Sequence, residues 1–346
     1  MDRTVAVTVT LKDIARQVNR SVTTVSRALH DCADVSPETR DLVKYTAAQL
    51  GYAPNVVAQR LQKQRTETIG LILPHHGPRL SDPSFGDMLT GVVDAIAGAG
   101  LDLLISSAGD VPDETPLYRQ RIGSRRVDGF WVVRTRCHDP RIRYLIEQGA
   151  AFVACGRVME AWDFPYVDVD YKHGMRSLVQ HLCQLGHRRI AFVTGWSDLT
   201  SVHHQRQSFV QSVSELGLDD DPELIVEGEM SQHGGYRAAQ VLFSQRQPAT
   251  AIIASTDLMA LGVMSAAQDQ GLEVGSDVAV AGFDDIPLAE TAHPTLTTVR
   301  QPAYQMGQLA GQMLAALAQG QPIARPRVLL QPSLIIRQST NLDLWL

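Results

Sequence analysis

The stretch TLKDIARQVNRSVTTVSRALH, residues 10–30, decides the fold of the first part of the chain. Thr10 is a suitable N-cap for a first helix, because such a residue can satisfy free backbone N–H groups of the first turn. Asn19 stands where the chain must turn, and asparagine tolerates a left-handed backbone better than most residues. Ser21 can then cap a second helix. The spacing predicts two short helices joined by a tight turn, a helix-turn-helix.

The second of these helices has two faces of different chemistry. Its apolar residues follow the helical period and face inward: Val25, Ala28 and Leu29. The outward face carries Val22, Thr23, Ser26 and Arg27. Hydroxyl groups suit phosphates and base edges, a methyl surface suits thymine, and arginine makes bidentate contacts with guanine. The pattern predicts a recognition helix for the DNA major groove, and an ordinary helical pair with a solvated face is the alternative.

A third helix is marked at both ends. Ser36 is its expected N-cap, Pro37 takes the first helical position, and Gly51 follows the last turn. Its expected core face is Leu42, Val43, Thr46, Ala47 and Leu50. Pro54 then breaks the chain, and a short run with helical potential follows before an apolar strand begins at Ile69.

Five segments of this region occur together in a specific order: TLKDIA, TTVSRAL, VSPETR, LGYAPN and the run AQRL. In order and spacing they resemble the DNA-binding head and hinge of the lactose/galactose repressor (LacI/GalR) family. The similarity continues through the chain to about Thr340. The resemblance implies a sequence-specific transcriptional regulator, a repressor, whose affinity for operator DNA is controlled by a small-molecule effector.

The resemblance also implies which residues meet DNA. In the head these are Thr10, Ser21, Val22, Thr23, Thr24, Ser26, Arg27 and Tyr52, and in the hinge Asn55, Ala58 and Leu61. The hinge would form a helix only on operator DNA, where two hinge helices of a dimer lie side by side and Leu61 enters the minor groove. A short segment behind Pro54 is not expected to be a stable helix alone. A plain flexible linker is the alternative.

We therefore expect five segments along the chain. They are a disordered N-terminus at 1–9, the head at 10–53, the hinge and linker at 54–66, an effector-binding and dimerisation core at 67–340, and a tail at 341–346. The tail is too short for a coiled coil, so we predict a homodimer, and a near-palindromic operator requires one.

The charge distribution agrees with this division. Residues 1–65 contain 10 Lys and Arg against 6 Asp and Glu, whereas the rest of the chain contains 21 against 31. A basic head on an acidic body favours a localised phosphate-binding surface. The four cysteines form no CxxC motif, so we expect neither a disulfide framework nor a metal site. With no secretory signal and no apolar run of about 20 residues, we expect a cytoplasmic protein without a membrane partner.

The body of the chain alternates strands and helices. Apolar, β-branched runs occur at 69–73, 101–106, 129–133, 151–154, 190–194, 251–254 and 278–281. Segments with helical period lie at 91–99, 174–185, 235–243, 258–270 and 304–318. This alternation predicts α/β structure with doubly wound parallel sheets, and the resemblance implies two Rossmann-like subdomains of the periplasmic-binding-protein type. No GxGxxG motif opens a helix after a strand, so no dinucleotide cofactor is expected.

Ligands of such sheets bind at the carboxyl ends of the strands. Residues that follow predicted strands or their loops are Phe85, Arg134, Arg136, Arg157, Asp257 and Asp284. Each alone has a plainer explanation, since such an aspartate often caps a helix and an arginine is often paired at the surface. The resemblance favours Phe85, Arg157, Asp257 and Asp284 as lining of the effector cleft.

Two positions depart from the family pattern. Gln205 stands where the family usually has an arginine, with Arg206 one residue later, and Met230 stands where many members have an aromatic residue. Both Arg206 and Met230 remain candidates for effector contact. A sugar is the expected effector, and a purine or a phosphorylated metabolite is the alternative, because arginine side chains bind diols, carbonyls and phosphates.

Two other classes of protein are less favoured. A sugar-binding transport protein would share the body but lack the head. An enzyme would need a nucleophile, base or metal cluster, yet His75-His76 and His203-His204 lack the spacing of a zinc site and are expected to be loop residues. Asp284-Asp285 is a poor acid/base pair, since neighbouring strand-end residues point in different directions.

Overall fold

The computed structural model describes residues 9–53, 65–74, 79–109 and 111–341. Its contacts divide the chain into two compact units, Met1–Arg65 and Thr66–Leu346, and each is described by itself. The expectations for the N-terminus, the hinge residues Asn55, Ala58 and Leu61, the His75-His76 pair and the tail beyond Asn341 lie outside the described residues.

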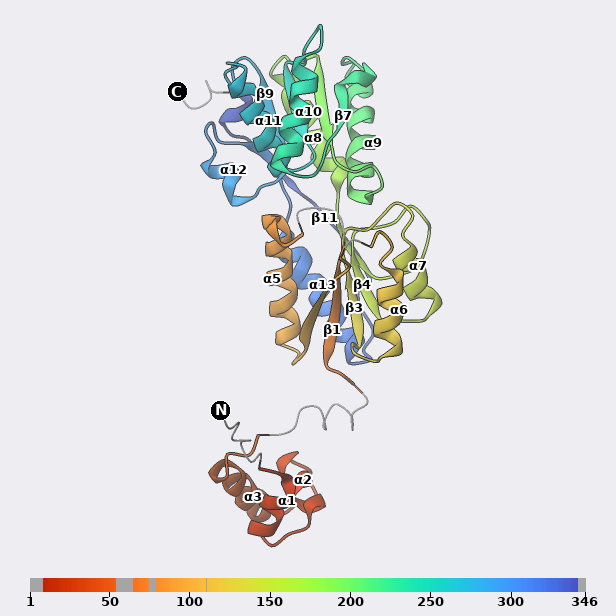
Figure 1. Cartoon of the computed structure of the whole chain (residues 1–346), viewed down its shortest axis with the longest axis vertical. Coiled ribbons are helices and arrows are strands. Elements are labelled where there is room, and N and C mark those ends of the chain that lie inside the picture. The colour runs from red at the N-terminus through yellow and green to blue at the C-terminus, as the bar shows by residue number, and fades with distance from the viewer. Residues whose placement is uncertain (1–8, 54–64, 75–78, 110, 342–346) are drawn as a thin grey trace, which may run out of the picture. The chain divides into compact units, whose positions relative to one another are not determined.

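The first unit is a bundle of short helices: α1 (Leu11–Gln17), α2 (Val22–Leu29) and α3 (Pro37–Gln49) (Figure 1). They enclose a small core of Ile14, Ala15, Val18, Val25, Ala28, Val35, Val43 and Ala47. A core this small leaves most of each helix exposed. The outward residues of α1 and α2 therefore do not pack in the core and are available for contacts outside the head.

The local signals for the head are confirmed almost throughout. Asp13 accepts hydrogen bonds from the N–H and the hydroxyl of Thr10 at 2.9 and 2.7 Å, and Ser21 accepts one from the N–H of Thr24 at 3.1 Å. Asn19 adopts the expected left-handed backbone, with φ of 49°. The expectation for Leu42 was wrong: its side chain is 47% exposed, because α3 turns Val43 rather than Leu42 into the core.

The second unit contains two sheets, each of six strands within the described part of the chain. The first has the order β11-β5-β4-β3-β1-β2, from β1 (Thr68–Leu73), β2 (Asp102–Ser107), β3 (Gly129–Val132), β4 (Phe152–Cys155), β5 (Tyr166–Val169) and β11 (Arg327–Leu330). The second has the order β12-β10-β9-β8-β6-β7, from β6 (Ile190–Thr194), β7 (Ile225–Glu227), β8 (Ala251–Ala254), β9 (Ala279–Asp284), β10 (Thr297–Arg300) and β12 (Ser333–Ile335).

Every strand pairing in the two sheets is parallel except that of β10 with β12. In each sheet the order of strands reverses at a strand in the interior, β1 in the first and β6 in the second. Such a switch point opens a crevice at the carboxyl ends of the strands. The predicted class, doubly wound α/β with a small all-α head, is confirmed.

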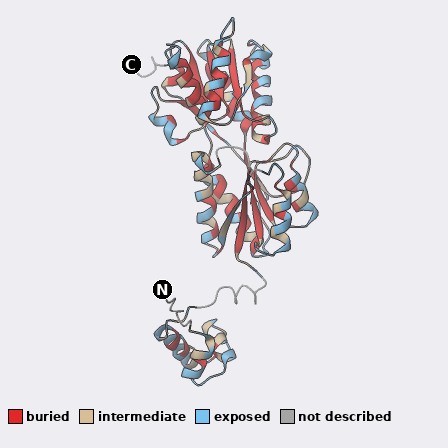
Figure 2. Cartoon of the chain, viewed as in Figure 1, coloured by how far each residue is buried: buried red, intermediate tan, exposed pale blue. Residues whose placement is uncertain are grey.

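Helices cover both faces of each sheet, with their apolar sides inward (Figure 2). On the first sheet they are α5 (Pro83–Ala97), α6 (Thr115–Gly123), α7 (Pro140–Glu147) and α13 (Ala303–Ala318). On the second they are α8 (Tyr171–Gln184), α9 (Thr200–Glu215), α10 (Gln232–Phe243), α11 (Asp257–Asp269) and α12 (Pro287–Thr291). Of the helices in the described ranges, none is both long and apolar enough to span a bilayer.

The chain passes between the two subdomains three times. It crosses after β5, after β10 and after β11, so the first subdomain contains residues 66–169 together with α13 and β11. The seven apolar runs predicted as strands are all strands, whereas β5, β7, β10, β11 and β12 were missed. The missed strands are short, and most lie at sheet edges or carry polar residues, which weakens the periodic signal.

Close packing of α5 on α13 depends on glycine. A Cβ atom added to Gly307 would lie 1.9 Å from the carbonyl oxygen of Met88, and one added to Gly91 would lie 2.1 Å from that of Tyr304. Both neighbours are backbone atoms, so the two helices would have to move apart.

We expect Gly307→Ala to lower the free energy of unfolding of the core by about 2 kcal/mol, because overpacking at this position displaces a helix. Calorimetric melting of the full chain checks this. Gly98→Ala is the control, since a Cβ there would lie 3.6 Å from its nearest neighbour, the carbonyl oxygen of Ala95. Equal melting temperatures for the two variants would contradict the packing argument.

Candidate functional site

The outward face of α2 is the first candidate site. Val22, Thr23 and Arg27 are exposed, and Thr24 and Ser26 are half-buried. Ser21 is exposed beside the turn, where its hydroxyl caps α2. The face therefore offers hydroxyl groups, a small apolar surface and one guanidinium on a helix of suitable size for a major groove.

Two further head residues were predicted to meet DNA. Thr10 is exposed at the N-terminus of α1, where its hydroxyl already donates to Asp13. Tyr52 is half-buried and packs on the core of the head, and this burial raises the pKa of its phenol. An exposed edge of each residue remains for a phosphate or a base.

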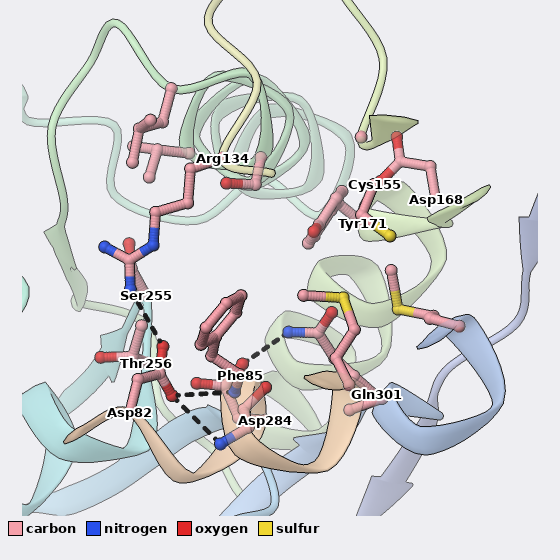
Figure 3. Close-up of a pocket in the computed structure, with 18 of the residues that line it drawn as sticks. Asp82, Phe85, Arg134, Cys155, Asp168, Tyr171, Ser255, Thr256, Asp284 and Gln301 are labelled. Atoms are coloured by element: carbon pink, nitrogen blue, oxygen red, sulfur yellow. Dashed lines mark hydrogen bonds and ion pairs between the residues drawn. The ribbon is translucent and has the colours of Figure 1, made fainter. Parts of the chain in front are cut away.

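The second candidate site is a cavity of about 130 Å³ between the two subdomains of the core, the cleft cavity. Figure 3 shows side chains of both subdomains around it. Its polar lining consists of Asp82, Ser84, Arg134, Thr135, Asp168, Tyr171, Ser201, Gln205, Ser255, Thr256, Asp284 and Gln301. Its apolar lining includes Phe85, Met88, Met230 and Met306. Of the predicted effector contacts, Phe85, Arg134, Met230 and Asp284 line this cavity.

A charged cluster forms one wall of the cleft cavity. Nη2 of Arg134 lies 3.4 Å from Oδ2 of Asp82, and Gln301 donates to Oδ1 of Asp284 at 2.5 Å. Burial raises the pKa of Asp284 well above its ordinary value, and the negative charges of Asp82 and Asp257 add to this effect. Burial likewise raises the pKa of Asp82, while Arg134 opposes the rise. Because both carboxyl groups line the cavity, their oxygens can accept hydrogen bonds from a ligand that brings N–H or O–H donors.

Strained backbone positions place this cluster. Arg134 has φ of 51°, Asp284 has φ of 128° and Asp285 has φ of 60°. Side chains other than glycine rarely adopt such conformations, and they concentrate where function requires them. Arg134 follows β3 closely and Asp284 ends β9, so both lie at the carboxyl edge of a sheet.

An aromatic side chain and a thioether form part of the apolar lining. Phe85 stacks on Trp131 with ring centroids 5.7 Å apart and an angle of 9° between the planes. Only 5% of Phe85 is exposed, so the predicted stacking face is largely held by the protein core. Met230 adds a flexible thioether to the wall.

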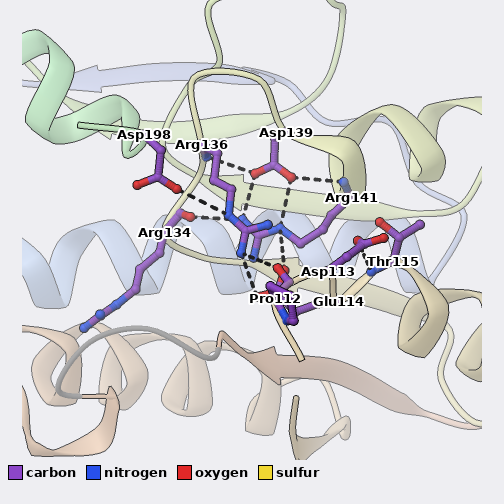
Figure 4. A network of polar contacts seen from close by, with 9 residues as sticks. All are labelled: Pro112, Asp113, Glu114, Thr115, Arg134, Arg136, Asp139, Arg141 and Asp198. Carbon is purple, nitrogen blue, oxygen red and sulfur yellow. Dashed lines mark hydrogen bonds and ion pairs between the residues drawn. The ribbon is translucent and has the colours of Figure 1, made fainter. Parts of the chain in front are cut away.

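Arg136 does not line the cleft cavity, because a buried network holds its side chain (Figure 4). Its Nη2 lies 2.8 Å from Oε1 of Glu114, which is fully buried. Within the same network Arg141 binds Asp139 through two hydrogen bonds of 2.9 and 2.7 Å and donates to the carbonyl oxygen of Arg134 at 2.9 Å. The network therefore supports the strained turn that presents Arg134 to the cavity.

Arg157 and Asp257 also stay outside the cavity lining. Nε of Arg157 donates to Asp168 at 2.6 Å, so it holds a carboxylate that does line the cavity. Asp257 is fully buried, where it accepts from the hydroxyl of Thr298 at 2.5 Å and from the N–H of Ile286 at 2.9 Å. Burial raises the pKa of Asp257 to about 7. These contacts hold the end of β9 next to Asp284.

The helix α9 turns Gln205, not Arg206, toward the cavity. Gln205 is 3% exposed, lines the cavity and donates to the carbonyl oxygen of Ser255 at 3.1 Å, whereas Arg206 is exposed. Adjacent positions of a helix differ by about 100° in direction, so Arg206 cannot share this contact. Gln205 therefore lines the cavity, and Arg206 does not.

The sequence did not single out several lining residues, among them Asp168, Tyr171, Ser255 and Gln301. Asp168 is the clearest of them, since an aspartate inside the run YVDV is a charged residue at a buried strand position. Gln301 follows β10 directly. It would have been a candidate had that strand been recognised.

Beside the cavity the two subdomains meet through backbone contacts. The N–H of Cys137 donates to the carbonyl oxygen of Asp198 at 2.7 Å, and that of Thr200 donates to Thr135 at 3.0 Å. Nε of Arg136 lies 3.9 Å from Asp198. These contacts link the end of β3 to the start of α9, and a ligand in the cavity would be enclosed on this side.

His203 and His204 are part of α9, so the expectation of loop residues was wrong for this pair. Both are half-buried. Burial, with the positive charge of Arg157 and the neighbouring His203, lowers the pKa of His204 to about 4. In the described part of the chain, no cluster of His, Cys, Asp and Glu could hold a metal ion.

The lowered pKa of His204 predicts a pH dependence of stability. In the unfolded chain His204 binds a proton near pH 6.5, whereas in the folded chain it does so only near pH 4. The folded state therefore loses stability as the pH falls through this window. We expect His204→Gln to reduce the loss of melting temperature between about pH 7 and pH 5. Thermal melts of both proteins across the window measure it, and parallel curves would contradict the assignment.

Family models match two separate parts of the chain. Residues 10–55 match the model "Bacterial regulatory proteins, lacI family", and residues 179–340 match the model "Periplasmic binding protein-like domain". The first match covers the helix-turn-helix and the second covers most of the second subdomain with the final strands.

Curated proteins and solved structures similar to the chain agree with these models. The HTH-type transcriptional repressor CytR of Escherichia coli K12 is 31% identical over 334 residues, which are 96% of this chain and 96% of that protein. A lac repressor dimer bound to operator and an anti-inducer has a TM-score of 0.85 at 26% identity, covering 96% of this chain and 99% of the other. A complex of the transcriptional regulator CelR with cellobiose has a TM-score of 0.74 at 29% identity, with the same coverage.

Proposed function

The chain belongs to the lacI family of bacterial regulatory proteins and is a DNA-binding transcriptional regulator, and from this premise we propose that it is an effector-controlled repressor. In this proposal a homodimer binds a near-palindromic operator, and a sugar in the cleft cavity controls the affinity for DNA. Control by an effector is supported by one observation, the cluster of charged and polar side chains at the carboxyl edges of the two sheets. Its members are Asp82, Arg134, Asp284 and Gln301.

The proposed DNA contacts are those of the head and hinge. They are Thr10, Ser21, Val22, Thr23, Thr24, Ser26, Arg27 and Tyr52, with Asn55, Ala58 and Leu61 of the hinge, which lie outside the described residues. The exposure of Val22, Thr23 and Arg27 on one face of α2 supports this assignment. A dimer is supported by the similar lac repressor dimer, since two identical heads bind two half-sites related by a two-fold axis.

A sugar suits the cleft cavity because its hydroxyl groups can donate to the carboxylates of Asp82 and Asp284 while its apolar ring face meets Met230 and Phe85. The similarity to a regulator in complex with cellobiose supports the same class of ligand. A phosphorylated ligand has less support, because Arg134 is already paired with Asp82 and Arg136 and Arg157 are outside the lining.

Control of DNA binding would follow from closure of the cleft. A ligand that binds both subdomains favours the closed arrangement, and coupling between two sites of a protein is typically worth about 1–3 kcal/mol. We infer regulation rather than catalysis, as the similar curated proteins are transcriptional regulators. We also propose that the protein acts in the cytoplasm, where its DNA target lies.

A thermal-shift screen of the full chain against mono- and disaccharides, sugar phosphates and purines tests the proposal. A ligand at about 100 times its dissociation constant stabilises the folded state by about 2.7 kcal/mol, which gives a clear shift. A shift with sugars supports the proposal. A shift confined to purines or phosphates would contradict the sugar assignment.

Asp284→Asn should abolish the shift that the sugar gives while DNA binding persists. Asparagine keeps the size of the side chain and tolerates unusual backbone angles, but it replaces one carboxyl oxygen, an acceptor, with an amide group that only donates. Titration calorimetry with the sugar that gives a shift measures the loss. Full affinity in this variant would mean that the ligand binds elsewhere.

A further inference from the structure

Arg27, on the outward face of α2, has an acidic partner. In the last turn of α2, its Nη2 forms an ion pair with Oδ2 of Asp34, which lies in the loop between α2 and α3. The side chains are 52% and 50% exposed, so the pair lies at the surface of the head. Arg27 is four positions beyond Thr23 and therefore shares its side of the helix.

Asp34 lies on a loop whose backbone is fixed. Val35 is 7% exposed and packs in the core of the head. Nη2 of Arg40 donates to the carbonyl oxygens of Cys32 and Val35 at 3.0 and 3.3 Å, and the N–H of Cys32 donates to the carbonyl oxygen of Arg27 at 3.0 Å. The loop is thus tied to α2 on one side and to α3 on the other.

The fixed loop lowers the entropic cost of forming this surface ion pair. Exposed pairs usually contribute little, because two long side chains must be ordered to form them. In this pair one partner is a short aspartate on a fixed backbone, so only the arginine has to be ordered. A guanidinium carries five N–H donors in a rigid planar fork, which is more than one carboxylate can engage.

We propose that Asp34 is a positioning residue for base recognition: it holds the guanidinium of Arg27 in one orientation, with the remaining N–H groups directed to a guanine edge. The inference rests on the proposed function, in which Arg27 contacts a base. Asp34 would sharpen the preference for one base pair in each half-site without touching the base itself.

A purely electrostatic effect of Asp34 makes a different prediction. A carboxylate near DNA weakens binding to every sequence alike, because phosphate contacts carry no sequence information. Two substitutions separate the effects. Asp34→Asn removes the charge but keeps an acceptor oxygen at the same place, whereas Asp34→Ala removes both the charge and the acceptor.

The experiment uses the full chain and an operator selected from randomised duplexes. Competition binding with each of the four base pairs, at the position where Arg27→Ala loses its preference, gives the discrimination factor. We expect Asp34→Ala to lower this factor about tenfold and Asp34→Asn less than about threefold. Binding to random duplexes should rise by a similar factor in both variants.

Asp41→Asn is the matched control, since Asp41 is an exposed carboxylate of α3 in the same unit. It removes the same charge and should leave the discrimination factor unchanged. Circular dichroism verifies that each head is folded. The proposal is overturned if Asp34→Ala keeps the full discrimination factor, or if the Asn and Ala variants lose it equally.

Failure of the proposed function would look different from failure of this inference. If Arg27→Ala itself leaves every base preference intact, then Arg27 is not a base contact and the assignment of the recognition face is wrong. If Arg27→Ala loses a preference that Asp34→Ala retains, then only the positioning role of Asp34 is wrong.

Discussion

Replacing Arg27 by alanine should abolish the preference of the protein for its operator at one base pair of each half-site. A bidentate contact between arginine and guanine is worth about 1–3 kcal/mol of discrimination, and a dimer loses it twice. The substitution should spare the fold, since the side chain is half exposed and contributes nothing to the core of the head.

Gel-shift titrations with the operator and with single-base variants measure this effect. Arg20→Ala is the control, because Arg20 is an exposed arginine beside the turn and its loss removes the same charge. We expect Arg20→Ala to weaken binding to all duplexes alike and to reduce the salt dependence. Operator discrimination that survives in Arg27→Ala would refute the recognition role of α2.

Arg141→Ala should destabilise the core more than Gly307→Ala does. Arg141 is fully buried beside Glu114 and Asp139, which are also buried, so its removal leaves carboxylates in the interior with less compensation. Breaking a buried ion pair from one side typically costs about 3–5 kcal/mol. The substitution also removes a donor from the carbonyl oxygen of Arg134, so ligand binding in the cleft cavity should weaken as well.

Calorimetry of the full chain measures the loss, and Arg143→Ala provides the comparison on the same helix. Arg143 pairs with Glu147 at 2.9 Å, but both side chains are largely exposed. Such surface pairs contribute about 0–1 kcal/mol. If both variants melt at the same temperature, the buried network does not stabilise the core.

The fold was largely predictable because its signals are local. Caps and turns such as Thr10, Asn19 and Ser21 act within a few residues, and buried parallel strands are continuous apolar runs that stand out in a sequence. The edge strand β11, with the sequence RVLL, carries too little periodicity to be recognised. Its pairing with β5 is decided by tertiary contacts far away in sequence.

The cleft was predictable only in part, because strand ends locate an edge but not the direction of each side chain. Arg134 and Arg136 follow the same strand, yet one faces the cavity and the other is drawn into the interior by Glu114. Nothing near Arg136 in the sequence reveals that partner. Asp257 shows the same limit, since its partners Thr298 and Ile286 belong to distant segments.

The three crossings between the subdomains have a consequence for synthesis on the ribosome. The last strand of each sheet comes from one stretch, 327–335, where β11 completes the first sheet and β12 completes the second. Domains generally fold in order during synthesis, which proceeds at about 5–20 residues per second. In this protein the sheet of the first subdomain stays incomplete until residues 327–330 have been made, so the two subdomains are completed together, and a chain that stops before residue 327 lacks one strand of each sheet.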